Sequence, residues 1–99
     1  MKNELENITT KLREELPKLR SQYNVISIEL FGSFIRNEQR ANSDLDILVT
    51  FSQAPSLFKF IELEDHLSDL LGIKVDLVMK SSLKPNIGKR ILSEAQSIL

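Results

Sequence analysis

The chain has 99 residues, enough for one small domain, and its 41% hydrophobic and 27% charged residues are ordinary values for a globular protein. The net charge of −1 and the scattered basic residues argue against a nucleic-acid-binding scaffold. Because there is no cysteine, a disulfide framework, a zinc ribbon and thiol chemistry are excluded. No apolar run reaches membrane-spanning length and the first residues are acidic rather than signal-like, so we expect a cytoplasmic protein.

Hydrophobic spacing predicts three helices. The first is amphipathic and contains Pro17, which should kink or split it. Its apolar face is Leu5, Ile8, Leu12, Leu16, Leu19 and Tyr23. The second is capped by Ser56 and stopped by Gly72. Its broad apolar face is Leu57, Phe58, Phe60, Ile61, Leu63, Leu67, Leu70 and Leu71. The last begins near Pro85. Its stripe is Ile87, Ile91, Leu92, Ala95 and Ile98.

Three apolar runs, residues 25–31, 44–51 and 74–79, predict β-strands. The loop between the first two is short, so they should pair antiparallel. The strand–helix–strand order that follows predicts a right-handed crossover that places the third strand beside the second. The expected fold class is α+β, a two-layer domain over residues 1–99 in which a small mixed three-stranded sheet packs against helices.

Three aspartates interrupt these strands. Asp44 and Asp46 are two residues apart, so their side chains share one face of the second strand, while Leu45 and its alternating neighbours face the core. Two surface carboxylates or a calcium loop could give the same pair, but an EF-hand needs later Gly and Glu ligands that the apolar continuation does not supply. Asp76 lies in an apolar strand, where an unpaired charge is costly. If the third strand lies beside the second, the three carboxylates converge and suit one or two Mg²⁺ ions.

The turn after the first strand offers a phosphate site. Backbone N–H groups following Gly32, with the Ser33 hydroxyl, can bind the oxygens of a triphosphate, although a structural turn with a helix cap explains them equally well. Arg36 is placed to reach a phosphate or to remain solvent-exposed. Ser43 either caps the turn before Asp44 or orients a carboxylate, and the local role is favoured.

One histidine is present, His66, in the middle of the second helix among acidic residues. We interpret it as a surface histidine, because no second metal-type ligand is placed beside it at helical spacing.

Gly32 and Ser33, then ten residues, then Asp44 and Asp46 together resemble the signature of the DNA polymerase beta-like nucleotidyltransferase superfamily, which has a palm-like fold. Asp76 resembles its third carboxylate, and the small size is similar to the minimal nucleotidyltransferases, the MNT proteins. The resemblance covers nearly the whole chain and departs from the usual pattern at Asn37, where many members have glycine.

The resemblance implies that Asp44 and Asp46 bind two Mg²⁺ ions and that Asp76 completes this site and helps to activate the acceptor hydroxyl. Gly32 and Ser33 would hold the phosphates of ATP. Many minimal members resemble antitoxins encoded beside a helical HEPN ribonuclease toxin, and transfer AMP from ATP to a tyrosine of that toxin.

The short chain fits such a partner-dependent enzyme, because a core of this size leaves little surface to hold a separate acceptor. Two alternatives stay open. The protein could neutralise its partner by complex formation alone, or it could modify a small molecule as antibiotic nucleotidyltransferases do, although the missing second domain argues against the latter. Homo-oligomerisation is also open.

Overall fold

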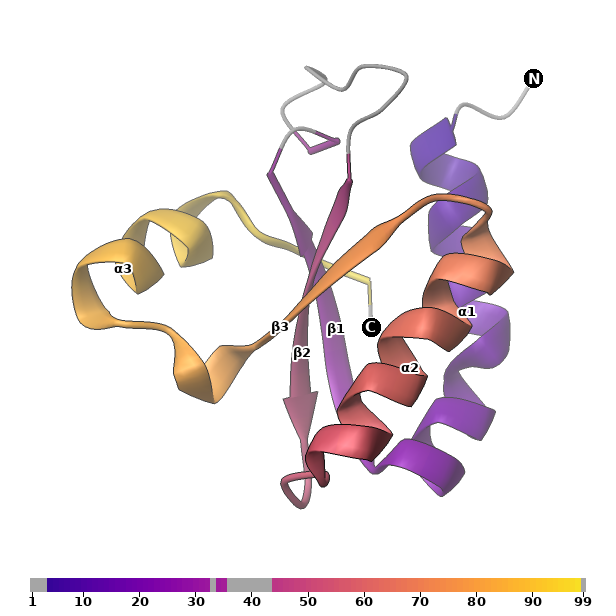
Figure 1. Ribbon diagram of the computed structural model, residues 1–99. Helices are drawn as coiled ribbons and strands as arrows, with labels where there is room; N and C mark the ends of the chain where they lie inside the picture. The colour runs from indigo at the N-terminus through magenta and orange to yellow at the C-terminus, as the bar shows by residue number, and fades with distance from the viewer. Residues whose placement is uncertain (1–3, 33, 36–43, 99) are drawn as a thin grey trace.

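The computed structural model describes residues 4–32, 34–35 and 44–98, without the side chain of Ile87. The elements, in chain order, are α1 (Glu4–Tyr23), β1 (Val25–Phe31), β2 (Leu45–Phe51), α2 (Leu57–Leu71), β3 (Val75–Met79), the 3-10 turn η1 (Lys80–Ser82), α3 (Pro85–Glu94) and β4 (Gln96–Ser97). Helices α1 and α2 lie side by side over one face of the sheet, and α3 lies on its other side (Figure 1).

The sheet has the strand order β3-β2-β1-β4. As predicted, β1 and β2 are antiparallel, and β3 lies parallel to β2. The expectation of three strands is wrong, because β4 pairs antiparallel with β1. A strand of two residues shows no alternation of apolar and polar side chains, so its pattern could not be recognised. The chain leaves α3 at Glu94, and Ile98 therefore packs into the core instead of extending the stripe of that helix.

Helix α1 is one continuous helix, so the predicted split at Pro17 is wrong. Leu12 and Leu19 lie on either side of this proline and are fully buried. Their packing offsets the hydrogen bond that proline cannot donate. The predicted ends of α2 are confirmed: the Ser56 side chain accepts a hydrogen bond from the Lys59 N–H, and Gly72 adopts the left-handed conformation that ends the helix.

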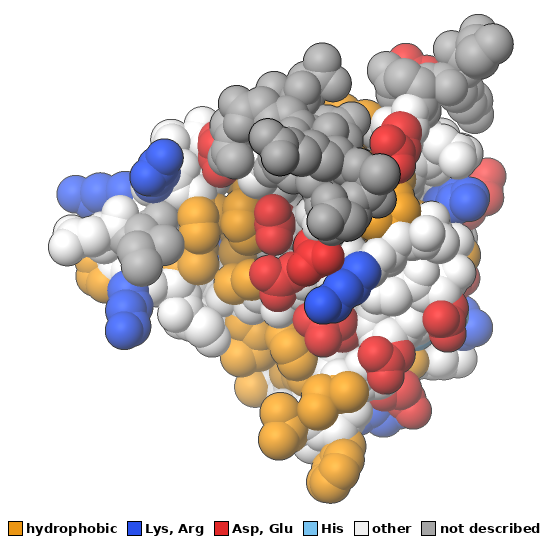
Figure 2. Space-filling model, turned by 45° about the horizontal axis from the view of Figure 1, so that its top comes forward, with side chains coloured by type: hydrophobic (Ala, Val, Ile, Leu, Met, Phe, Trp, Pro, Cys, Tyr) orange, Lys and Arg blue, Asp and Glu red, His pale blue; other side chains and the backbone are white. Residues whose placement is uncertain are grey.

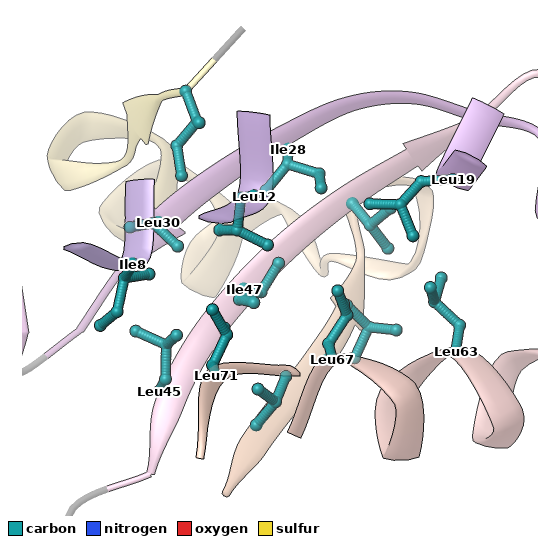
Figure 3. Packing of buried hydrophobic residues seen from close by; sticks show 14 of the residues in the cluster. Ile8, Leu12, Leu19, Ile28, Leu30, Leu45, Ile47, Leu63, Leu67 and Leu71 are labelled. Carbon is teal, nitrogen blue, oxygen red and sulfur yellow. The ribbon is translucent and has the colours of Figure 1, made fainter. Parts of the chain in front are cut away.

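The core fills the space between the two helices and the sheet (Figure 3). Leu45, Ile47 and Val49 of β2 point into it, as their alternation predicted. Buried leucines of both helices close it from the other side. They are Leu12 and Leu19 of α1 with Leu63, Leu67 and Leu71 of α2.

The predicted broad apolar face of α2 is only partly buried. Leu63, Leu67 and Leu71 form one row at intervals of four and face the sheet. Leu57 and Ile61 belong to a neighbouring row and are 71% and 45% exposed, while Phe58 is 85% exposed. One helix presents a single stripe to the sheet, so these three residues, the α2 patch, stay outside the core.

The end of the sheet where β1 finishes and β2 begins is the upper end in Figure 1. Phe31 and Leu48 point to the face of the sheet away from α1 and α2, because they alternate with core-facing neighbours. Both are buried, although they lie outside the core cluster. Within the described part of the chain, no helix has the length and apolar character needed to cross a bilayer.

Candidate active site

Asp46 and Asp76 are direct register partners on the parallel strands β2 and β3. Partners in a ladder point to the same face, and neighbouring strands are about 4.8 Å apart, so the two carboxylates project side by side. Asp46 is half-buried and Asp76 is exposed, so both are reachable from solvent. This pairing is what the predicted crossover required. Figure 2 shows acidic side chains gathered on this face beside hydrophobic ones.

Asp44 is half-buried and lies immediately before β2, where the Leu45 N–H donates to the Lys74 carbonyl at 2.8 Å. This hydrogen bond joins the starts of β2 and β3, the two strands that carry the other aspartates. Asp44 is thereby held at the same end of the sheet as Asp46 and Asp76.

Gly32 closes the site on the side of β1. The last residue of β1, Phe31, is the register partner of Asp46, and Gly32 follows it with a φ of +83°. A Cβ atom at position 32 would overlap Oδ2 of Asp46 and would stand 3.0 Å from its Cγ. The Asp46 carboxylate can therefore lie here only because residue 32 has no side chain. The Gly32 carbonyl also accepts the Ile35 N–H at 3.1 Å to close the turn.

Three of the predicted phosphate-binding residues, Ser33, Arg36 and Ser43, lie outside the described residues, as does Asn37. Their roles stay predictions.

The donor set at this end of the sheet is made of carboxylates, which are the ligands that Mg²⁺ prefers. Among the residues that the structure describes, no group of three or more His, Cys, Asp or Glu side chains is close enough to hold a metal ion by itself. Mg²⁺ is commonly bound by one or two carboxylates together with water and substrate phosphates. The side-by-side carboxylates of Asp46 and Asp76 fit that kind of site.

The chain was compared with known proteins. Residues 10–98 match the model of the nucleotidyltransferase domain family. The chain belongs to this family. The expectation of an enzyme of the nucleotidyltransferase class is thereby confirmed, and so is the fold class.

Similarity to individual proteins supports the same family assignment. This nucleotidyltransferase is 53% identical to the protein adenylyltransferase MntA of Thermococcus cleftensis over 91 residues, which are 92% of this chain and 89% of that relative. Among solved structures, it is similar to a toxin–antitoxin crystal structure with AMP-PNP at 26% identity and a TM-score of 0.76, covering 92% of this chain and 72% of that one. At 22% identity it shares the fold of a chain in the complex of a tri-AMPylated Shewanella oneidensis HEPN toxin with its MNT antitoxin, with a TM-score of 0.68 and coverage of 93% and 71%.

His66, predicted to be a surface histidine, is partly buried. Its Nε2 atom lies 2.8 Å from Oε2 of Glu15, and the Glu15 side chain is partly buried as well. The partner is 51 positions away in the sequence, so helical spacing could not reveal it.

Two further residues were missed by sequence reasoning. Oε2 of Glu64 accepts the Leu77 N–H at 2.8 Å, and Oγ of Ser68 accepts the Val75 N–H at 3.0 Å. The sequence gives no sign of this role for Glu64, because only the packing of α2 against the edge of β3 brings it to the strand that carries Asp76.

Proposed function

We propose that this nucleotidyltransferase transfers AMP from ATP to a hydroxyl group of a partner protein in the cytoplasm, and that the partner is a HEPN toxin that the transfer silences. The observation that carries the proposal is the pairing of Asp46 with Asp76 beside Gly32, on the face of the sheet away from α1 and α2. The names of the MntA relative and of the toxin–antitoxin complex with AMP-PNP support the donor, the type of acceptor and the type of partner.

In this proposal Asp44, Asp46 and Asp76 would hold two Mg²⁺ ions together with the phosphates of the substrate. When bound, Mg²⁺ neutralises phosphate charge and favours the departure of pyrophosphate. The backbone N–H groups after Gly32 and the Ser33 hydroxyl hold the phosphates, and Arg36 adds a positive charge to them.

The chain's own carboxylates act on the acceptor. Asp76 is exposed, so an incoming hydroxyl can reach it, and it takes the proton as the hydroxyl oxygen bonds to the α-phosphorus of ATP. The bond to pyrophosphate breaks in the same transfer, which leaves AMP on the acceptor oxygen.

A labelling assay tests the proposal. The protein is incubated with ATP labelled at the α-phosphate, Mg²⁺ and the product of the adjacent gene, and transfer is followed by gel and mass spectrometry. We expect labelling by the wild type, and a loss of at least about 100-fold in Asp46→Asn and Asp76→Asn, because each removes charge from the site. Asp69→Asn, an exposed acid on α2, is the matched control and should label normally.

Equal labelling by the wild type and both site variants, or labelling by none of them, contradicts catalysis with that acceptor. A second experiment does not need the acceptor: binding of AMP-PNP in the presence of Mg²⁺ is measured by calorimetry. We expect binding to the wild type that weakens in Asp46→Asn and not in Asp69→Asn.

A second function, neutralisation by complex formation alone, is favoured by the exposed α2 patch of Leu57, Phe58 and Ile61. Apolar side chains clustered on a surface commonly mark a protein contact. If binding alone neutralises the partner, a double variant, Asp46→Asn with Asp76→Asn, still protects cells that express the toxin. If transfer is required, the double variant forms the complex but gives no protection.

A further inference from the structure

The outer edge of β3 is covered by two side chains of α2. Because β3 is an edge strand with β2 as its neighbour on one side, alternate backbone N–H groups of β3 point away from the sheet. The Val75 N–H donates to Oγ of Ser68 at 3.0 Å, and the Leu77 N–H donates to Oε2 of Glu64 at 2.8 Å. An edge strand usually leaves such groups to water, so two side-chain acceptors in succession are a specific arrangement.

Val75 and Leu77, whose N–H groups are bound in this way, immediately precede and follow Asp76. On its inner side, β3 is held to β2 by the parallel ladder, in which Asp76 pairs with Asp46. On its outer side, the neighbours of Asp76 are held to α2. The backbone at Asp76 is therefore fixed from both sides, and this fixes the direction in which its Cα–Cβ bond leaves the strand toward Asp46.

The acceptors are themselves fixed. The Ser68 hydroxyl donates to the Glu64 carbonyl at 3.0 Å while it accepts from Val75. Helix α2 is anchored below them by the buried Leu63, Leu67 and Leu71. The bond from Leu77 to Glu64 involves a carboxylate, and charge-assisted hydrogen bonds of this type are roughly twice as strong as neutral ones.

We propose that Glu64 and Ser68 are positioning residues that hold Asp76 in register with Asp46 for nucleotidyl transfer. The inference rests on the proposed function, because it assigns a task to Asp76. Each of the two side chains accepts a hydrogen bond from a backbone N–H of β3, so each acts through that backbone. The same hydrogen bonds could instead serve only to keep the edge of β3 from pairing with other chains. In that case, removing them would leave the turnover of a folded monomer unchanged.

The test compares Glu64→Ala, Glu64→Gln and Ser68→Ala with the wild type in the labelling reaction. Glutamine keeps an acceptor oxygen and should restore most of what alanine removes. Glu62→Ala is the matched control, because Glu62 is an exposed acid on the same helix that pairs with Lys59. Melting temperature and aggregation state are measured for every variant.

We expect Glu64→Ala to lower kcat about 10- to 100-fold while the KM for ATP changes less than about threefold, since supporting residues of catalytic sites commonly have effects of this size. Ser68→Ala should shift kcat in the same direction, and Glu64→Gln should stay within about threefold of the wild type. Amide hydrogen exchange supplies a readout without turnover: protection of the Leu77 N–H falls in Glu64→Ala and is retained in Glu64→Gln.

Two outcomes overturn the inference. The first is a folded Glu64→Ala variant with wild-type kcat although Asp76→Asn is inactive, which leaves the proposed function intact. The second is a loss of kcat that glutamine fails to restore. Labelling that is insensitive to Asp76→Asn overturns the proposed function itself, and the inference with it.

Discussion

The imidazole of His66 on α2 lies 2.8 Å from the carboxylate of Glu15 on α1, through Nε2 and Oε2. The His66 ring also stacks on Tyr23 of α1, with ring centroids 6.3 Å apart. Both contacts join the two helices that cover the core. The only histidine of the chain therefore contacts α1 twice from the helix that also carries Glu64.

A double-mutant cycle measures this pair. His66→Ala and Glu15→Ala should each destabilise the protein by about 1 kcal/mol, because each removes one partner of a partly buried hydrogen bond. We expect a coupling energy of about 0.5–1.5 kcal/mol from urea unfolding of the single and double variants. Strictly additive effects would show that the two side chains do not stabilise each other.

The sequence predicts the strands and the placement of two aspartates because local pattern and a topological rule suffice there. Alternation places Leu45 and Ile47 inward and Asp46 outward, and the right-handed crossover brings Asp76 beside Asp46. Both steps use information carried by neighbouring residues or by the order of elements.

Other features depend on contacts between distant segments. The strand β4 exists because Gln96 meets Leu30 across the sheet, and no periodicity marks it. The exposure of Phe58 depends on which row of α2 faces the sheet. Glu64 meets Leu77 only after α2 has docked. Hydropathy alone cannot distinguish an apolar residue that is buried from one that stays on the surface, nor a surface acid from one that accepts a backbone hydrogen bond.

Stability at alkaline pH should depend on Tyr23. Burial, followed by the charge and hydrogen bond of Glu62, raises the pKa of the Tyr23 phenol above its usual value. The neutral phenol is therefore favoured in the folded state. Its contribution to stability is fully present below about pH 10, the unfolded pKa of tyrosine, and is lost as the pH rises through the folded pKa. The melting temperature of the wild type should exceed that of Tyr23→Phe by an amount that declines above about pH 10. A difference in melting temperature that stays constant with pH would contradict this role of Tyr23.

The division of α2 into a buried row and an exposed patch predicts unequal costs for the same substitution. Leu67→Ala removes a side chain that is 1% exposed and should destabilise the protein by about 2–5 kcal/mol. Leu57→Ala removes one that is 71% exposed and should stay within about 0.5 kcal/mol of the wild type. Chemical denaturation of both variants provides the measurement. A cost above about 2 kcal/mol at Leu57 would mean that the α2 patch is packed in the free protein.

Gly32 and Gly72 form a matched pair that separates backbone strain from crowding of the site. Both have positive φ, +83° and +66°, so alanine costs roughly 1–2 kcal/mol of strain at either position. A Cβ at Gly72 meets nothing within 4 Å, whereas a Cβ at Gly32 runs into the Asp46 carboxylate.

Gly72→Ala should therefore lower the free energy of unfolding with little change in nucleotidyl transfer. Gly32→Ala should lower it by a similar or larger amount and should also reduce kcat by about 100-fold, because a displaced Asp46 carboxylate misaligns the reacting groups. Unfolding and labelling assays on both variants give the comparison. Equal losses of activity in the two variants would show that strain alone, and not the space beside Asp46, accounts for the glycine at position 32.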